Sequence, residues 1–406
     1  MASVFPFAAY SPAFKDAADV ATLPYDVMNR AEAQKMASSN AKSFLRVTRS
    51  EIELDDSIDA YSPDVYERAR INWNAFVADG VLSKDAAPAY YVYSLVMNGR
   101  RQTGIVGAYS VADYEDGTVR RHERTRKDKE DDRTRHISML RVQTGPVFLT
   151  YRDSDAINAI VDTAMKTAPL FDFTAEDGIT HTGWRVPAEL TASLQKAFAD
   201  LPRLYIADGH HRAASAARTL ATLTENGTAT PETGRVLSVI FPASQLKILA
   251  YNRLVFNLGT LTPQQFIEKL QAVCTMKPTD NPIPDTIGKC CMYFQKKWVE
   301  LTLNTPAADA DPIDKLDVSV LQHDVLSPIL GIDDPRTSRR IDFVGGIRGT
   351  AELERRVDSG EAVVAFSMYP TTLDQLMDIA DNNGIMPPKS TWFEPKLRDG
   401  LFVHEI

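Results

Sequence analysis

The sequence predicts an α+β fold in which mixed β-sheets carry flanking helices. Apolar residues recur every three or four positions in some segments, as in amphipathic helices, and alternate or run continuously in others, as in strands. The two kinds of segment follow one another without the regular repeat of a doubly wound sheet. At 406 residues and 44% apolar content, the chain can form several buried cores. We place three regions at 1–115, 116–245 and 246–406.

The first region begins with short helices and loops. Helices are predicted over residues 31–37 and 63–80, the second because its apolar residues keep helical spacing up to a stop at Gly80. Two β-rich runs then flank Asn98-Gly99, the dipeptide that most favours a two-residue hairpin turn.

The second region starts with a charged run at 120–136 that contains no apolar residue. A strand follows the Gly145-Pro146 turn, and residues 155–200 predict two helices around an extended pair. A strand then enters an Asp-Gly turn and an alanine-rich helix, and another strand covers 235–241.

The third region alternates between helical and strand patterns, and its tail at 387–406 is interpreted as a loop and a short hairpin. Helices are predicted at 264–273, 318–330, 351–360 and 372–384, and strands at 290–294, 298–303, 341–346 and 362–369.

Composition limits the classes of function. The net charge of −9 argues against nucleic acid or an anionic membrane as the main partner. The three cysteines lack CxxC spacing, so no zinc site is indicated, and their low, odd number suits a reducing compartment. The first residues do not resemble a signal peptide, and no apolar run approaches 18 residues. We therefore expect a cytoplasmic protein without a membrane span.

Residues 206–218, IADGHHRAASAAR, concentrate the side chains that can carry chemistry. A strand that enters a glycine turn and then a helix presents backbone N–H groups and the positive end of the helix dipole, which suits a phosphate. Asp208 adds an acceptor or metal ligand, His210 and His211 are titratable, and Arg212 can bind phosphate oxygens. Alternatively, Asp208 caps the helix and the other side chains are solvated. We favour a site because these residues occur together.

Two other segments are candidates. The run at 120–136 is either a solvated helix face or mobile loop, or a functional segment in which Glu123 is a general base and Arg126 and Lys129 contact phosphate oxygens. The tail motif PPKST offers a cation and two hydroxyls after a rigid turn, in Lys389, Ser390 and Thr391. The segment LPYDVM is interpreted as a turn in which Asp26 caps the helix that begins near Asn29.

Across almost its whole length the chain resembles the bacterial domain-of-unknown-function family 1015. The matching segments fall in order: LPYDV, SFLRV, QTGIVG, HERTRKDKE, TGPVF, YIADGHHRAASA, DPRT, IDFVGGIRG and MPPKSTWF.

The Asp-Gly-His-His-Arg box is also similar to the phosphate-gripping box of the ParB/sulfiredoxin superfamily, which includes CTP-binding ParB and free-serine kinases. This resemblance implies a central core of that fold, box residues that hold magnesium or phosphate, and an upstream glutamate that acts as base on the substrate hydroxyl. Glu123 precedes Asp208 in that order, and their separation by 85 positions requires either an insertion or a different glutamate. Sulfiredoxin itself is disfavoured because no cysteine lies near the box.

These features predict a nucleotide-dependent phosphotransferase that acts on a small hydroxyl substrate, most concretely a free L-serine kinase that makes O-phosphoserine. ATP or ADP would be the donor, with Mg²⁺ on Asp208. A homodimer is compatible with this expectation. The alternatives are a ParB-like regulatory protein that binds a nucleotide without turnover, and a metal-dependent phosphohydrolase. The expected catalytic residues are Glu123, Asp208 and His210, and the expected phosphate or nucleotide ligands are Gly209, His211, Arg212, Arg126, Lys129, Lys389, Ser390 and Thr391.

Overall fold

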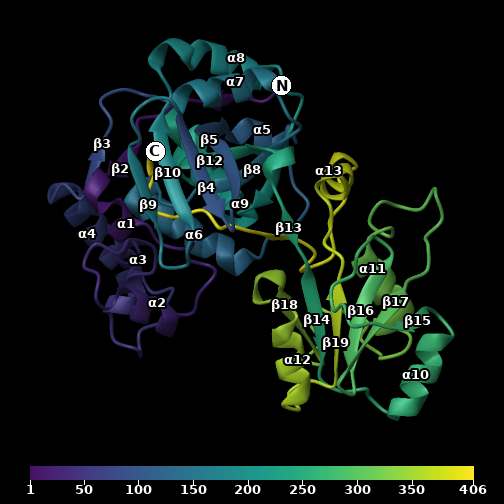
Figure 1. The fold of residues 1–406 in the computed structure, drawn as a ribbon. Helices are drawn as coiled ribbons and strands as arrows, with labels where there is room; N and C mark the ends of the chain where they lie inside the picture. The colour runs from purple at the N-terminus through teal and green to yellow at the C-terminus, as the bar shows by residue number, and fades with distance from the viewer. The chain divides into compact units, whose positions relative to one another are not determined.

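The computed structural model describes residues 1–406 and divides into two compact units. The first unit contains Met1–Leu246 together with Pro395–Ile406, and the second contains Lys247–Glu394 (Figure 1). The three regions named from the sequence stay a prediction; the two units divide after Leu246 and again after Glu394. Residues 1–115 and 116–245 share the first unit because strands from both belong to one sheet.

A nine-stranded mixed sheet forms the centre of the first unit. Its strands run in the order β6-β11-β8-β12-β5-β4-β10-β9, and β1 pairs with β5 beside this path. The β12–β8 and β11–β6 pairs are parallel and the others are antiparallel. The predicted hairpin is confirmed, with Asn98 and Gly99 at φ 51° and 76° between β4 and β5. The strands are β1 (Val4–Phe5), β4 (Tyr91–Met97), β5 (Arg100–Ser110), β6 (Val119–Arg120), β8 (Val147–Tyr151), β9 (Phe171–Thr174), β10 (Thr180–Arg185), β11 (Leu204–Asp208) and β12 (Arg235–Pro242).

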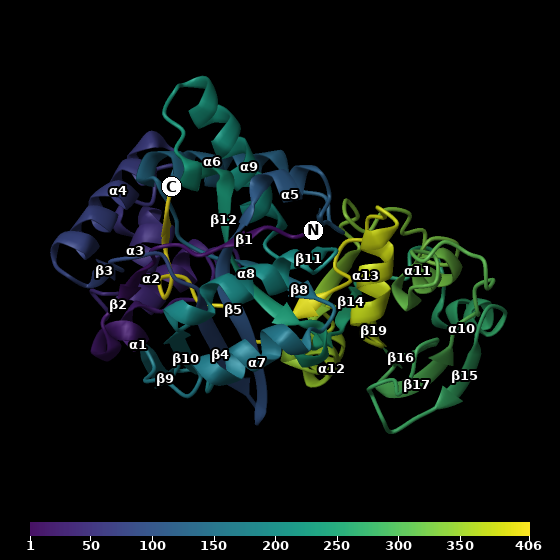
Figure 2. The same ribbon diagram turned by 90° about the horizontal axis from the view of Figure 1, so that it is seen from above.

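Helices accompany this sheet, and α6 packs against α9 and α4 (Figure 2). The predicted helices of this unit are confirmed, but Asp26 does not cap α2. The cap is Asn29, whose side chain accepts from the backbone of Glu32 while the Glu32 carboxylate accepts from the Asn29 N–H. The helices are α1 (Ala17–Val20), α2 (Arg30–Ala37), α3 (Leu45–Thr48), α4 (Pro63–Ala78), α5 (Val111–Glu115), α6 (Lys127–Leu140), α7 (Asp155–Ala164), α8 (Thr191–Ala199) and α9 (His210–Glu225).

The hairpin predicted for the tail is wrong. The tail does contain two short strands, but each pairs with a strand from elsewhere in the chain. Strand β20 (Trp392–Phe393) pairs with β13 (Ile248–Leu249), whereas β21 (His404–Glu405) pairs with β7 (Val142–Gln143). A further short pair joins β2 (Tyr10–Pro12) to β3 (Leu82–Lys84).

The second unit contains an antiparallel sheet in the order β15-β17-β16-β19-β14-β18. The helix predicted at 318–330 is shorter, since α11 passes into a single π-helical segment at Gln322–Leu326. These elements are β14 (Tyr251–Val255), α10 (Pro263–Gln271), β15 (Thr275–Pro278), β16 (Lys289–Phe294), β17 (Lys297–Thr302), α11 (Asp317–Leu321), β18 (Ile341–Gly345), α12 (Ala351–Asp358), β19 (Val364–Met368) and α13 (Leu373–Asp381). In neither unit does a helix have the length and apolar character needed to cross a lipid bilayer.

The returning segment 395–406 completes the core of the first unit. Phe402 is 2% exposed, and its ring centre lies 5.1 Å from that of Tyr91 and 5.5 Å from that of Phe171. Arg398 donates from Nε to His181 Nε2 at 3.2 Å, which ties the segment to β10. Residues 395–406 are therefore packed into the first unit as part of its core.

We expect Phe402→Ala to lower the free energy of unfolding of the first unit by about 3–5 kcal/mol, because it leaves a cavity among buried aromatic rings. Urea titration followed by hydrogen–deuterium exchange of the β4 and β10 amides measures this unit alone. The matched control is Phe14→Ala, since Phe14 is 57% exposed. Equal stability of the two variants would contradict the assigned packing.

Candidate functional site

The predicted strand–turn–helix is present where β11 meets α9. Gly209 has φ 95°, a left-handed conformation that residues with a Cβ rarely adopt, and it turns the chain directly into the helix. A Cβ at this position would lie 3.2 Å from the Arg212 guanidinium. Helix α9 has no side-chain cap, so Asp208 is not its N-cap, and the first N–H groups of the helix face the turn.

Asp208 ends β11 beside two cations. Its Oδ2 lies 3.7 Å from Lys396 Nζ and 3.3 Å from the guanidinium of Arg212. Desolvation opposes ionisation, but Lys396 and Arg212 more than offset it and hold the pKa of Asp208 at about 2. The side chain of Asp208, which is 35% exposed, is therefore ionised at neutral pH and lies beside the turn.

Arg212 lies beneath the turn, with a side chain that is only 8% exposed. One terminal nitrogen donates to the carbonyl of Pro146 and the other to Asp208. Burial lowers the pKa of Arg212, but the carboxylates of Asp26, Asp208 and Asp399 outweigh burial and raise it. The guanidinium is therefore permanently charged, and both of its terminal nitrogens bond to protein atoms, whereas its Nε has no hydrogen-bond partner.

Glu123 and His210 lie together at the first turn of α9. Glu123 Oε2 is 3.7 Å from His210 Nδ1, and the backbone N–H of His122 approaches Nε2 of the same imidazole at 3.5 Å. His210 is 4% exposed whereas the Glu123 side chain is 55% exposed, so the carboxylate faces solvent. The structure thus brings together residues that are 87 positions apart in the sequence.

The rings of His122 and His210 meet edge to face, with centres 4.5 Å apart. Burial lowers the pKa of His122 to about 4 and lowers the pKa of His210 well below its ordinary value. Neither ring nitrogen of His122 has a hydrogen-bond partner. Both imidazoles are uncharged at neutral pH.

The charged run is a short loop followed by α6. The backbone N–H of Arg126 donates to His211 Nε2 at 3.0 Å, which attaches the loop to the turn, while the Arg126 guanidinium is exposed and paired with Asp128 at 2.8 Å. Lys129 donates to the Tyr61 hydroxyl at 2.9 Å and lines a cavity of about 210 Å³ between α6 and the N-terminal helices. The interpretation as a wholly solvated helix face is wrong, because α6 buries polar side chains, among them Asp132, Arg133 and His136.

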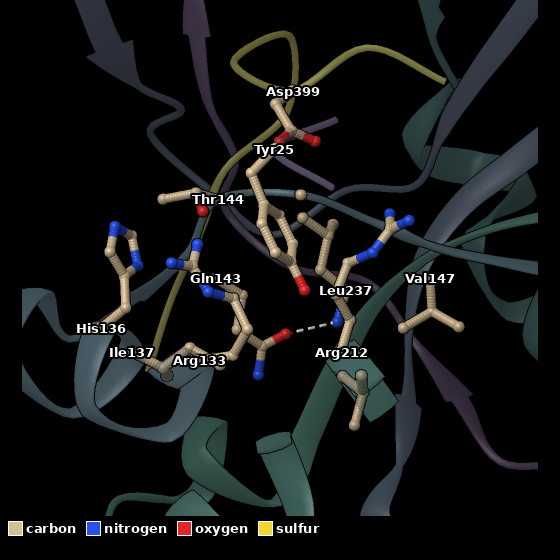
Figure 3. Close-up of a pocket in the computed structure, with 12 residues that line it drawn as sticks. Tyr25, Arg133, His136, Ile137, Gln143, Thr144, Val147, Arg212, Leu237 and Asp399 are labelled. Atoms are coloured by element: carbon tan, nitrogen blue, oxygen red, sulfur yellow. Dashed lines mark hydrogen bonds between the residues drawn. The ribbon is translucent and has the colours of Figure 1, made fainter. Parts of the chain in front are cut away.

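A small cavity of about 20 Å³ adjoins the turn, which is room for about one water molecule (Figure 3). Tyr25, Arg133 and Arg212 lie around it, and the Arg133 guanidinium stacks 4.0 Å from the centre of the Tyr25 ring. Asp399 is 1% exposed and its Oδ1 has no partner. Burial raises the pKa of Asp399 to about 7 against the opposing charge of Arg212.

Lys389, Ser390 and Thr391 lie in the second unit, so their convergence on Asp208 stays a prediction. The Ser390 hydroxyl donates to the carbonyl of Pro387 at 2.7 Å, and its own carbonyl accepts from Thr371. Ser390 therefore fixes the local loop. Lys389 Nζ lies 5.5 Å from the centre of the Tyr251 ring.

Sequence reasoning missed Lys396 and Asp399, which reach the turn from the returning segment. Both follow Trp392 in a stretch interpreted as a loop and hairpin, and nothing in their spacing indicates that they return to a turn near residue 208. Tyr25 and Asp26 were noticed, but as a helix cap. The ordered motifs were the available signal, because LPYDV, HERTRKDKE, TGPVF and the Asp-Gly-His-His-Arg box all meet here.

No group of three or more histidine, cysteine or acidic side chains is arranged to hold a metal ion. A divalent cation at Asp208 would therefore take its remaining ligands from water and from the phosphates of a nucleotide, the usual coordination of Mg²⁺ in phosphoryl transfer. The side chains at the turn therefore do not form a complete metal site by themselves.

No curated protein sequence matches the chain significantly. Among solved structures, SbnI with a C-terminal truncation from Staphylococcus aureus is similar at a TM-score of 0.38 and 12% identity, over 72% of this chain and 85% of that one. A mutant free serine kinase in complex with AMP is similar at 0.35 and 13%, over 68% and 83%. A conserved hypothetical protein from Pyrococcus furiosus is similar at 0.34 and 14%, over 71% and 92%.

The family comparison covers most of the chain. The model described as "Protein of unknown function (DUF1015)" matches residues 4–319, a range that includes the whole Asp-Gly-His-His-Arg turn and the charged run. This protein therefore belongs to the DUF1015 family.

Proposed function

We infer that this protein is a nucleotide-dependent phosphotransferase acting on a small hydroxyl compound, most concretely a kinase that converts free L-serine into O-phosphoserine. The observation that carries the proposal is the pairing of Glu123 with His210, 3.7 Å apart at the uncapped start of α9. The Glu123 carboxylate, which can accept a proton, would thus lie close to the first backbone N–H groups of α9, and such groups bind phosphate. The choice of serine comes from the resemblance of the box to that of free-serine kinases.

Phosphoryl transfer needs positioning and charge stabilisation more than covalent chemistry from the protein. In the proposed reaction the acceptor oxygen forms a bond to the terminal phosphorus while the phosphoanhydride P–O bond breaks, which leaves the nucleotide one phosphate shorter. Glu123 takes the hydroxyl proton. The N–H groups that follow Gly209 bind the transferring phosphate, and the neutral His210 ring orients the Glu123 carboxylate.

Asp208 would hold Mg²⁺ together with the phosphates of ATP or ADP, and the ion would neutralise negative charge on the phosphates. Arg212 is a positioning residue, since its terminal nitrogens bind Pro146 and Asp208 and so fix the carboxylate. His211 holds the loop that carries Glu123 through its hydrogen bond from the Arg126 N–H. Arg126 and Lys129 remain proposed phosphate contacts, as do Lys389, Ser390 and Thr391.

The test is to incubate the purified protein with ATP, ADP or CTP, Mg²⁺ and a panel of hydroxy compounds that includes L-serine. A kinase consumes nucleotide only when its acceptor is present and forms O-phosphoserine from serine. Nucleotide binding without acceptor-dependent consumption would replace the proposal with a nucleotide sensor. Release of phosphate from phosphate esters without added nucleotide would replace it with a phosphohydrolase.

Glu123→Gln should reduce acceptor-dependent turnover by about 10²–10⁴-fold, because the amide cannot take the hydroxyl proton. The melting temperature should not change, since the side chain is largely exposed. Glu225→Gln is the matched control, because this exposed residue lies at the other end of α9. Full activity of Glu123→Gln would show that another group is the base.

Asp208→Asn should reduce turnover by at least about 100-fold and raise the Mg²⁺ concentration needed for half-maximal rate, because a neutral amide is a poorer ligand for Mg²⁺ than a carboxylate. The Mg²⁺ dependence of the initial rate measures this effect. Asp200→Asn is the control, since Asp200 is an exposed aspartate paired only with Lys196. An unchanged Mg²⁺ dependence would remove Asp208 from the metal site.

His122 should stay uncharged down to about pH 5.5, and its imidazole proton resonances should not move between pH 8 and 5.5, because its pKa is lowered to about 4. In the urea-unfolded chain all seven histidines should titrate near pH 6.5. The unfolded state then binds more protons than the folded state, so the free energy of unfolding contributed by His122 falls as the pH drops from about 6.5 towards 4. Titration of His122 near 6.5 in the folded protein would contradict its burial.

A further inference from the structure

A buried arginine without a counter-ion lies in the sheet of the second unit. Arg253 is 3% exposed in the middle of β14, between β18 and β19. One terminal nitrogen donates to the carbonyl of Tyr251, and the guanidinium carbon lies 5.4 Å from the centre of the Phe343 ring. No aspartate or glutamate shifts its titration: burial lowers the pKa of Arg253 to about 10, and only Cys290 and Tyr251 oppose the effect.

An isolated guanidinium in such a place is unfavourable, because a buried charge is normally paired or bound to several hydrogen-bond acceptors. Arg212 in the first unit shows the usual arrangement, with carboxylates around it. Arg253 has five N–H donors, and the one acceptor bonded to it is the Tyr251 carbonyl. An acceptor from outside the chain would satisfy the remaining N–H donors of Arg253 and balance its charge.

A cavity of about 110 Å³ lies beside Arg253. It is several times the space that one water molecule needs, so it admits a small organic molecule. Val318 and Leu326 of the α11 region, Ile341 and Phe343 of β18, and Pro387 supply apolar walls.

Ser319 provides a second, independent observation. It lines the same cavity from α11, it is 5% exposed, and its hydroxyl is buried without any hydrogen-bond partner. A buried hydroxyl without a hydrogen-bond partner is uncommon, and Ser319 and Arg253 line the same cavity. The π-helical segment Gln322–Leu326, a distortion that often marks functional sites, forms part of the wall.

We propose that this cavity binds a small organic carboxylate, whose oxygens accept hydrogen bonds from the Arg253 guanidinium and the Ser319 hydroxyl while its short apolar group lies against Ile341, Phe343 and Pro387. A planar carboxylate matches the two parallel donors of a guanidinium. The proposal is independent of the phosphotransferase function, since none of the residues in it has a proposed catalytic or phosphate-binding role.

The observations favour a carboxylate over a phosphate. One buried cation balances one negative charge, whereas a phosphate carries up to two and is usually met by several backbone N–H groups or by more than one cation. Asp314 also lines the cavity, which disfavours a more highly charged anion. The mainly apolar walls favour binding of the apolar group of an organic carboxylate, and they offer no such contact to inorganic phosphate.

Ligand-detected saturation-transfer NMR on the full chain tests the proposal with acetate, butanoate, benzoate, inorganic phosphate and the neutral isostere butanamide. We expect saturable binding of butanoate, weaker binding of acetate and none of butanamide. Phosphate binding by itself, followed by ³¹P line broadening, would overturn the assignment to carboxylates. Equal binding of butanoate and butanamide would overturn the role of the charge.

Arg253→Met should abolish butanoate binding without lowering the melting temperature, because an apolar side chain of similar length replaces an unpaired buried charge. Arg348→Met is the matched control, since Arg348 is an exposed arginine of the same unit and should leave binding unchanged. Butanoate binding that survives Arg253→Met would overturn the proposal.

Ser319→Ala keeps the test independent of any effect of Arg253 on folding. Because the hydroxyl has no partner in the ligand-free protein, its removal should leave the melting temperature unchanged, yet it should weaken butanoate binding about tenfold or more, the usual loss for a hydrogen bond to a charged group. Unchanged affinity in Ser319→Ala would show that the hydroxyl does not contact the ligand and would overturn the two-point site.

Discussion

The Arg212 guanidinium connects the strand–turn–helix to the rest of the first unit. It donates to Pro146 before β8 and to Asp208 at the end of β11, and it lies in the field of Asp26 and Asp399. These groups come from four separate segments, so one buried charge brings together parts of the chain that local structure cannot join. Gly209 is required for the same reason, since a Cβ at that position would press against the guanidinium.

Electrostatics divide the site into charged and neutral parts. Asp208 stays ionised because Lys396 and Arg212 compensate for its desolvation. His122 and His210 stay neutral because they are buried against each other with little compensating charge. Glu123 lies at the border between the two parts, exposed to solvent but within 4 Å of an imidazole. This position is compatible with the proposed role of Glu123 as a proton acceptor, since both neighbouring imidazoles are uncharged.

Local patterns predicted the elements well. Asn98-Gly99 determined the hairpin, and the sequence IADGHHRAASAAR determined β11, the turn and α9, because these features depend on neighbours within a few residues. The partners of Asp208 could not be predicted in this way. Lys396 lies 188 positions further along the chain and comes to the turn only because its segment returns to the first sheet. The tail hairpin failed for the same reason, since its strands pair with β7 and β13.

The first unit is interrupted in sequence by the whole of the second. During synthesis the ribosome makes β1 to β12, then all of the second unit, and only afterwards the segment that supplies Lys396, Phe402 and β21. Until then the nascent sheet lacks part of its core and Asp208 lacks one of its two cations. The contact between Asp208 and Lys396 can therefore form only after the second unit has been synthesised. The second unit can fold before residues 395–406 of the first unit have been made.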